Sequence, residues 1–495
     1  CINNLSNLIG AIAQTNNVAG DIPASSHVND IIALQLAIGE NDCDETGNGN
    51  NDASCANHLE STNFIDSITQ ANAADADSAD QLNNATIGQA LDLVNDCDES
   101  DDGVNTASCH VDDVDNLVGP IEQFNEASGS ALADISQNNQ INGPDVTSAG
   151  ILQVILATND CDESGPGNND AFCDIESVDN DFNAITQAND IDAADDDTVI
   201  SQDNRASIGQ VILAGNDCDE SSTAIELNDA NCVIDENSDQ FIHTVDQTND
   251  AEAQDFSQAD QDNNVALSQG LFAVNDCDGT DGNLASCTNN GNDDVNGIED
   301  IDQVNEASLT SNAISEQSNE LGISQIVNLV NDCDETDAQL NDATCANDNI
   351  NNIIGPIEQN SDNSAGDEAL GATIAQSNEG QITQELVAVN DCDETGAGSN
   401  LAVCRNLPVF NFIDDIDGIS QTNDALVADD FVQNNLLAIS QDMQATNNCD
   451  EFGDGNDGDS GVAQICRNEG GNSIGAISQS NAAQGTEVSD ISQNN

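Results

Sequence analysis

The amino-acid sequence predicts an all-β fold, specifically a β-solenoid of stacked three-strand repeats with parallel, in-register sheets and one cystine loop per repeat. Three observations predict it: apolar and polar side chains alternate along short segments, one segment pattern recurs through all 495 residues, and cysteines recur in pairs. Alternation at period two is typical of a pleated strand. Recurrence of one pattern along a whole chain is typical of a repeat array.

Residues 199–232 carry the pattern most completely. Ile200, Gln202 and Asn204 share one parity of the alternation, and Gln210 continues it. Amide side chains on a buried face need hydrogen-bond partners. A stack of similar rungs supplies them, because each amide can bond its copies in the rungs above and below as a ladder. The ladder positions predicted in this way are Gln14, Gln70, Gln81, Asn83, Gln89, Gln187, Asn189, Gln202, Asn204, Gln210, Gln261, Asn263, Gln269, Gln317, Asn319, Gln325, Gln376, Asn378, Gln384, Gln421, Gln433, Asn435 and Gln441.

The recurrence predicts a single repeat array over residues 1–495. Each repeat is expected to hold three strands followed by the cystine loop, and one strand of every repeat stacks on its equivalents to form a parallel sheet. At ~4.8 Å per rung the array would form a rod roughly 40 Å long. The predicted repeats are residues 2–55, 56–109, 110–173, 174–232, 233–287, 288–345, 346–404 and 405–466, with a partial repeat at 467–495.

The charge balance restricts the partners of the chain. It has 94 acidic residues, three arginines and no lysine, which gives a formal net charge of −91. Repulsion excludes nucleic acid and anionic membrane surfaces as direct partners, and the charge instead favours divalent cations or high salt. Low hydrophobicity with high net charge is also typical of disorder. The periodic Ile, Val and Leu and the regular cysteine spacing argue against disorder here.

The cysteine usage predicts an oxidising compartment. No segment is long and apolar enough to span a membrane, and the sequence does not begin with a signal peptide. We therefore expect a mature extracellular product, either secreted or held at the cell surface.

The cysteines pair most simply within the loops. Most of the gaps between paired cysteines are 12 residues, and a loop of this length gives about 3 kcal/mol of stabilisation per bond on the chain-entropy model. Zinc binding would need closer Cys/His spacing and a reducing setting. Pairing between neighbouring rungs stays open, because spacing alone does not fix connectivity. The expected within-loop pairs are Cys43–Cys55, Cys97–Cys109, Cys161–Cys173, Cys218–Cys232, Cys277–Cys287, Cys333–Cys345, Cys392–Cys404 and Cys449–Cys466.

Three of the loops match the first half of a calcium-binding loop. Oxygen-bearing side chains occupy positions 1, 3 and 5, and a glycine follows. No glutamate stands reliably at position 12, so the loops are not EF-hands. Two interpretations stay open: calcium sites, or solvated acidic loops screened by salt. The candidate calcium ligands are Asp42, Asp44, Thr46, Asp160, Asp162, Ser164, Asp391, Asp393 and Thr395.

No residue pattern indicates catalysis. The four histidines, His27, His58, His110 and His243, occupy non-equivalent positions in the repeats, and we expect them at the surface or in loops. Carboxylates are too abundant for any pair to be singled out as acid and base. The sequence therefore predicts that the chain is not an enzyme.

The second and third strands of most repeats read Gln-x-Asn-x-Ala-x-x-x-Gln or a close variant, as at residues 81–89 and 202–210. This pattern resembles the curlin repeat of curli-type amyloid fibres, whose stacked rungs carry inward Gln and Asn ladders. The resemblance covers a third to a half of each repeat and implies a secreted fibre subunit of an extracellular matrix. The third strand, the cystine loop and the extreme acidity depart from the curlin pattern.

Together these features predict the structural subunit of an extracellular filament that assembles with copies of itself, head to tail. Cys1 and Asn495 are the expected residues of the subunit junction, because the last repeat is incomplete and Cys1 stands where a second loop cysteine would stand. The alternative is a monomeric calcium-binding repeat, such as an adhesin stalk or a surface-layer component. An ice-binding solenoid would need a Thr-rich outward ladder, which the sequence lacks.

Overall fold

The structure is a computed structural model, and its described part is built of β-strands without any helix. The described residues are 2–19, 24–43, 51–57, 61–75, 78–100, 105–129, 134–141, 150–165, 169–193, 198–222, 229–235, 239–253, 258–280, 284–290, 296–309, 314–336, 340–365, 372–395, 399–413, 418–426, 430–449, 451–452, 465–484 and 490–494.

The strands form three parallel sheets, and each turn of the chain, here called a rung, contributes to them in the same order. The first broad sheet comprises β1 (Ile2–Asn3), β2 (Ser6–Ile9), β3 (Ile12–Val18), β5 (Asn51–Asn57), β6 (Ser61–Ile65), β7 (Ile68–Asp75), β10 (Asn105–Val118), β11 (Ile121–Gly129), β15 (Asn169–Ala193), β18 (Asp229–Asp235), β19 (Gln240–Ala253), β22 (Leu284–Asn290), β23 (Asn296–Leu309), β26 (Leu340–Ile354), β27 (Ile357–Ala365), β30 (Ser399–Ile413), β31 (Ile419–Leu426), β34 (Ile465–Ile474) and β35 (Ile477–Gln484). The second broad sheet comprises β4 (Ser25–Asp42), β8 (Ser78–Asp96), β12 (Asp134–Ile141), β13 (Ile151–Asp160), β16 (Val199–Asp217), β20 (Gln258–Asp276), β24 (Ile314–Asp332), β28 (Thr373–Asp391), β32 (Asp430–Asn448) and β36 (Asp490–Asn494). The narrow third sheet comprises β9 (Glu99–Ser100), β14 (Glu163–Gly165), β17 (Glu220–Ser222), β21 (Gly279–Thr280), β25 (Glu335–Thr336), β29 (Glu394–Thr395) and β33 (Glu451–Phe452).

Neighbouring rungs pair in register, so that like residues stand above like residues. In the second sheet Gln202 of β16 pairs with Gln261 of β20. In the first sheet Cys173 of β15 pairs with Cys232 of β18. The same parallel pairing continues from rung to rung through the described strands. The predicted all-β class and the parallel, in-register stacking are therefore confirmed.

The division of a rung into strands differs from the expectation. The second and third predicted strands are one continuous strand in most rungs, as in β16 and β20, because the alternation of inward and outward side chains passes through the join without a break. The third rung is different: β12 and β13 are separate strands on either side of residues 142–149, which lie outside the described residues. A rung therefore has two long sides and a short third side, instead of three comparable strands.

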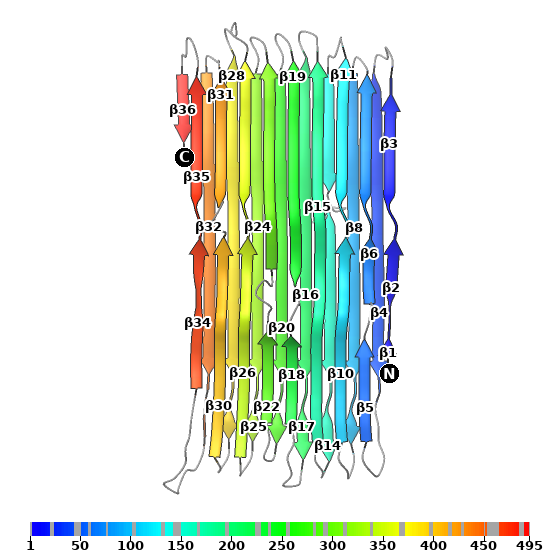
Figure 1. Ribbon diagram of the computed structural model, residues 1–495, viewed down its shortest axis with the longest axis vertical. Coiled ribbons are helices and arrows are strands. Elements are labelled where there is room, and N and C mark those ends of the chain that lie inside the picture. Colours follow the sequence, from blue (N-terminus) through cyan, green and yellow to red (C-terminus); the bar gives the residue numbers. More distant parts are fainter. Residues whose placement is uncertain are drawn as a thin grey trace.

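The molecule is a slab and not a rod. In Figure 1 the strands run along the longest axis, and the rungs follow one another across the slab from the N-terminal side to the C-terminal side. β15 has 25 residues, and at ~3.3 Å per residue it extends roughly 80 Å. That is about twice the length expected along the stacking direction, so the predicted rod shape is wrong.

The two broad sheets enclose a core of alternating apolar and amide strips. Aliphatic side chains gather into clusters that run from rung to rung, with rows of buried Gln and Asn between them. A further cluster consists of cysteine and alanine and closes the core beside the third sheet. Along β16 and just beyond it, the inward residues are Ile200, Gln202, Asn204, Ala206, Ile208, Gln210, Ile212, Ala214, Asn216 and Cys218.

Candidate functional site

Most buried amides bond their equivalents in the neighbouring rungs and also bond the facing sheet. Asn204 Nδ2 donates to Asn263 Oδ1 in the next rung at 3.0 Å, and Asn204 Oδ1 accepts from Asn139 Nδ2 in the preceding rung at 3.0 Å. Across the core, Asn204 Nδ2 donates to the Thr248 carbonyl oxygen at 3.0 Å and Asn189 Nδ2 donates to Asn204 Oδ1 at 2.9 Å. These bonds satisfy a polar group that would otherwise be costly to bury.

The two kinds of amide ladder point in opposite directions. Within the glutamine columns the donors point toward the N-terminal rung: Gln261 Nε2 donates to Gln202 Oε1, and Gln317 Nε2 donates to Gln261 Oε1, both at 2.8 Å. Asparagine donors point toward the C-terminal rung, as in the 3.0 Å bond from Asn204 Nδ2 to Asn263 Oδ1. The two surfaces that meet between neighbouring rungs therefore differ: one presents glutamine donors, and the other presents glutamine acceptors.

The structure places every predicted ladder residue on the inward face of its strand. Two of them, Gln14 and Gln441, are half-buried, because at these positions their strands pair with a described strand on one side only. The buried members are Gln70, Gln81, Asn83, Gln89, Gln187, Asn189, Gln202, Asn204, Gln210, Gln261, Asn263, Gln269, Gln317, Asn319, Gln325, Gln376, Asn378, Gln384, Gln421, Gln433 and Asn435.

Besides a shorter column of Asn289, Asn347 and Asn406, two further amide columns were not predicted. One contains Asn216, which continues the inward parity of β16 up to the cystine loop and donates to Asn275 Oδ1 at 3.0 Å. The other contains Asn116 and Asn180 of the first sheet, which share a 3.0 Å bond. A left-handed residue before Asn116, Asp113 with φ 54°, inserts one extra position and reverses the parity of the alternation. The parity of Asn216 could have revealed the first column, whereas this insertion hides the second.

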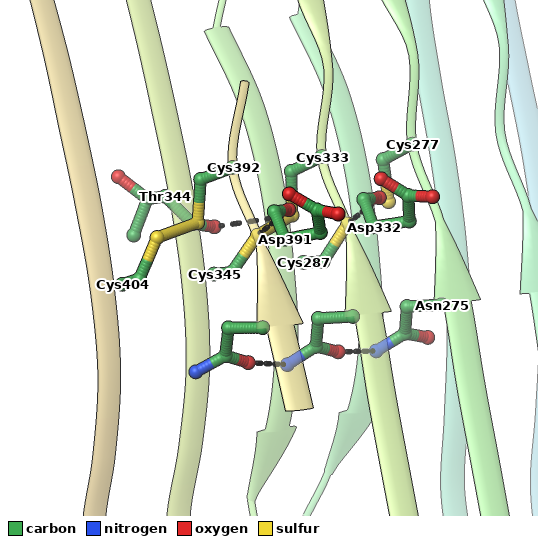
Figure 2. Close-up of a disulfide and its surroundings, with 12 residues drawn as sticks. Asn275, Cys277, Cys287, Asp332, Cys333, Thr344, Cys345, Asp391, Cys392 and Cys404 are labelled. Atoms are coloured by element: carbon green, nitrogen blue, oxygen red, sulfur yellow. Dashed lines mark hydrogen bonds between the residues drawn. A yellow bond between two sulfur atoms is a disulfide. The ribbon is translucent and has the colours of Figure 1, made fainter. Parts of the chain in front are cut away.

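The cysteines form two adjacent columns at the edge of the core, with an asparagine ladder beside them (Figure 2). One column contains the first cysteine of each cystine loop, which directly follows a strand of the second broad sheet. The other column contains the second cysteine of each loop, which belongs to a strand of the first broad sheet. Beside them, Asn275 Nδ2 donates to Asn331 Oδ1 at 3.0 Å, and Asn331 Nδ2 donates to Asn390 Oδ1 at 2.9 Å.

The disulfides follow two pairing patterns. Three bonds close a loop within one rung, and these predicted pairs are confirmed: Cys333–Cys345, Cys392–Cys404 and Cys449–Cys466. Four bonds instead join the second cysteine of one loop to the first cysteine of the next: Cys55–Cys97, Cys109–Cys161, Cys173–Cys218 and Cys232–Cys277. The predicted pairs Cys43–Cys55, Cys97–Cys109, Cys161–Cys173, Cys218–Cys232 and Cys277–Cys287 are therefore wrong.

Stacking explains why the spacing along the chain could not decide between these patterns. A second cysteine lies close both to the first cysteine of its own rung and to the first cysteine of the next rung. The Cα–Cα separation is 6.3 Å in the between-rung pair Cys232–Cys277 and also 6.3 Å in the within-rung pair Cys333–Cys345. Both geometries lie within the range that a disulfide spans.

Cys287 is a free thiol where the two pairing patterns meet. It is fully buried, and its Sγ donates a hydrogen bond to the Asp332 carbonyl oxygen at 3.1 Å. Burial raises the pKa of the Cys287 thiol well above its ordinary value, and the carboxylates of Asp276 and Asp332 raise it further. The thiol is therefore protonated at neutral pH.

The predicted calcium ligands that the structure describes lie on the outer side of the same edge. Asp42, Asp160 and Asp391 belong to one aspartate column that precedes the cysteines, and Asp162 and Asp393 belong to a second column that follows them. Ser164 and Thr395 have exposed side chains in the third sheet. Asp44 and Thr46, like the expected junction residues Cys1 and Asn495, lie outside the described residues.

These aspartate columns bring like charges together. Burial, and then the neighbouring carboxylates of both columns, together raise the pKa of Asp160, Asp217 and Asp332 to about 6. Backbone N–H groups offset part of the repulsion: the Asp219 N–H donates to Asp162 Oδ1 at 3.4 Å. An edge of this kind can attract cations, which lower the repulsion between its carboxylates.

The described histidines differ in position. His27 is buried, which corrects the expectation of a surface or loop position, because it stands in a glutamine column next to Gln81. His110 and His243 lie on the outer face of the first sheet; His243 Nδ1 is 2.9 Å from Glu299 Oε2. His58 lies outside the described residues.

Comparisons of this chain with protein-family models, with curated proteins and with solved structures give no match. Over the described ranges, no helix has the length and apolar character needed to cross a membrane. The disulfides are typical of proteins outside the reducing cytoplasm.

Proposed function

We propose that the chain is the structural subunit of an extracellular filament in which copies stack end to end and continue the sheets. The observation that carries the proposal is the direction of the amide ladders. Glutamine donors face one end of the array and glutamine acceptors face the other, and the asparagine ladders are complementary in the opposite sense. Such unlike faces match when two copies stack head to tail, which generates an open filament.

The terminal described rungs support the same proposal. β4 is an 18-residue strand that pairs with β8 on one side only among the described strands. Four apolar side chains on its outer face are 60–71% exposed: Ile32, Leu34, Leu36 and Ile38. Soluble proteins usually protect an edge strand with charge, proline or a short length. A long apolar edge strand is instead suited to pairing with another chain.

Electron microscopy of the purified protein, with and without a calcium chelator, tests the proposal. We expect uniform filaments whose width matches the slab and whose strands lie across the filament axis, and we expect them to survive chelation. Single slabs at every protein concentration would contradict it. An assembly of curli-like character would also give fibre diffraction with a 4.7–4.8 Å meridional spacing.

A matched pair of variants tests the ladder contact itself. Gln14 accepts a hydrogen bond from Gln70 Nε2 at 3.3 Å, and its inward amide would bond the next copy in the filament. The adjacent Thr15 points outward and is exposed. We expect Gln14→Leu to raise the protein concentration needed for filament growth at least several-fold, and Thr15→Leu to leave it nearly unchanged. Equal effects of the two changes would contradict ladder continuity across the junction.

The aspartate columns favour a second candidate function, a calcium-dependent binding module such as an adhesin stalk or surface-layer component. Burial and then repulsion from neighbouring carboxylates raise the pKa of Asp160 and Asp217, and a divalent cation would relieve the repulsion. In this case chelation would collapse isolated slabs, and calcium would raise their melting temperature without promoting filaments.

A further inference from the structure

We propose that the free thiol of Cys287 exchanges with the disulfides on either side of it, so that the thiol can move along the cysteine columns rung by rung. The proposal concerns the covalent connections within one copy, and it does not depend on filament assembly. It rests on three features of the described cysteines: their mutual distances, the change of pairing pattern at Cys287, and the equivalence of the two patterns.

The distances allow direct attack. The sulfur atoms of Cys232, Cys277 and Cys287 all lie within 4.8 Å of one another. Attack by the Cys287 thiolate on the Cys277 sulfur forms a Cys277–Cys287 bond and breaks the Cys232–Cys277 bond. The electron pair of the broken bond leaves on the Cys232 sulfur, which takes up a proton equivalent to the one that Cys287 lost. One disulfide and one thiol are present before and after, so the step needs no oxidant or reductant.

The same step can be repeated in the N-terminal direction. The sulfur atoms of Cys173, Cys218 and Cys232 also lie within 4.8 Å of one another. A thiol released at Cys232 can therefore attack Cys218 and release Cys173. Each step replaces one between-rung disulfide by one within-rung disulfide and moves the thiol to the preceding rung.

The opposite direction is also open in chemical terms. The register places Cys287 beside Cys345 in the next rung, and Cys345 is bonded to Cys333. Attack on the Cys333 sulfur forms a Cys287–Cys333 bond and releases Cys345. Further steps end at Cys466, whose sulfur lies within 4.8 Å of those of Cys404 and Cys449. In this direction each step converts a within-rung bond into a between-rung bond.

The position of the thiol thus sets how many rungs are joined covalently to their neighbours. Rungs on the N-terminal side of Cys287 are joined to each other by disulfides, and the described rungs on the C-terminal side have only closed loops. The neighbouring packing is the same for both patterns, since cysteines and alanines repeat in every rung of this cluster. Exchange therefore changes the covalent connections while the fold stays the same.

The rate of exchange should depend strongly on pH. Only the thiolate is nucleophilic, and Cys287 is buried next to carboxylates that oppose its ionisation. Exchange should be slow at pH 7 and should accelerate about tenfold per pH unit toward pH 9, because the thiolate fraction rises in that proportion below the pKa.

Disulfide mapping of the folded protein as a function of time tests the proposal. The protein is incubated without reductant, under argon and with a chelator, at pH 7 and pH 9. It is then quenched in acid, unfolded, and labelled with N-ethylmaleimide under mildly acidic conditions that suppress exchange. Because the chain has no lysine, the peptides are produced with a protease that cleaves at aspartate. We expect the label to start at Cys287 and to spread with time to Cys232 and Cys345, faster at pH 9.

Two controls separate this exchange from other routes. Cys287→Ser removes the nucleophile, so the disulfides on both sides should keep their original partners at both pH values. A tenfold dilution should leave the rate unchanged, because attack occurs within one copy. Label that stays on Cys287 alone at every time point would overturn the proposal, as would spreading that is equally fast in Cys287→Ser or that slows in proportion to dilution.

Discussion

Replacing Asn263 by alanine should test the amide ladders more directly than any other single change. Asn263 lies near the middle of β20 and is 1% exposed. It accepts hydrogen bonds from Asn204 and Asn249 and donates to Asn305 and Asn319, each with a donor–acceptor distance of 3.0 Å. Asn263 Nδ2 also contacts the carbonyl oxygens of Gln247 at 3.3 Å and Val304 at 3.0 Å. The change Asn263→Ala removes all of these bonds and leaves a cavity in the amide strip.

The expected loss can be worked out from these contacts. A buried hydrogen bond contributes about 1 kcal/mol net, and leaving a buried partner unsatisfied costs about 1–3 kcal/mol. Asn204 and Asn249 bond each other and so keep part of their hydrogen bonding. We therefore expect Asn263→Ala to lower the free energy of unfolding by about 3 kcal/mol.

The adjacent residue provides a control with the same chemistry. Asn264 points outward, and its Nδ2 donates one exposed hydrogen bond to Glu320 Oε2 at 2.9 Å. Asn264→Ala should therefore change stability by less than about 0.5 kcal/mol. Urea denaturation gives the free energies of unfolding. Hydrogen exchange along β20 and β24 gives the local loss of stability. This local measurement is needed because a repeat array can unfold one part at a time. Equal losses for the two variants would refute the assignment of the inward face.

Two further predictions concern pH. Aspartates with a raised pKa bind more protons in the folded chain than in the unfolded chain, so stability should fall as the pH rises from about 4 to about 6. In low salt with a chelator, the melting temperature at pH 8 should lie below that at pH 5; a rise with pH would contradict the assigned charge repulsion. Asp179 allows a test at a single site. Burial and then the carboxylates of Asp239 and Asp115 raise the pKa of Asp179 to about 8. The Asp239 N–H, which donates to Asp179 Oδ1 at 3.1 Å, opposes this shift. Asp179→Asn should therefore stabilise the protein by several kcal/mol at pH 8 and by little at pH 4. Urea titrations that show the same effect at both pH values would count against this explanation.

The fold could be predicted largely because the inward residues of the second sheet repeat without interruption. Gln202, Asn204 and Gln210 share one parity over a 19-residue strand, and their copies recur in the neighbouring rungs. Amides at buried positions make sense only when equivalent amides stack, so the parallel register follows from their chemistry. The same unbroken alternation joins the second and third predicted strands into one strand, so the corner expected between them is absent.

The parts that could not be predicted depend on geometry between rungs. A cysteine 12 residues from its loop partner can lie equally close to a cysteine more than 40 residues away once the rungs stack, as Cys55 does to Cys97. Left-handed residues have a similar effect in the first sheet: Ser177, with φ 52°, reverses the parity before Val178. A pattern read at period two stops at such a position, although the strand continues.

The equivalence of neighbouring rungs also bears on how the length of such a protein can change over time. Each inward amide bonds mainly its own kind, so removal of one whole repeat would bring Gln202 next to a residue identical to Gln261, its present neighbour. Recombination between two copies of the repeat would therefore preserve the partners that a point mutation such as Asn263→Ala destroys. A gene built from these units can gain or lose whole rungs more easily than it can tolerate substitution at single core positions.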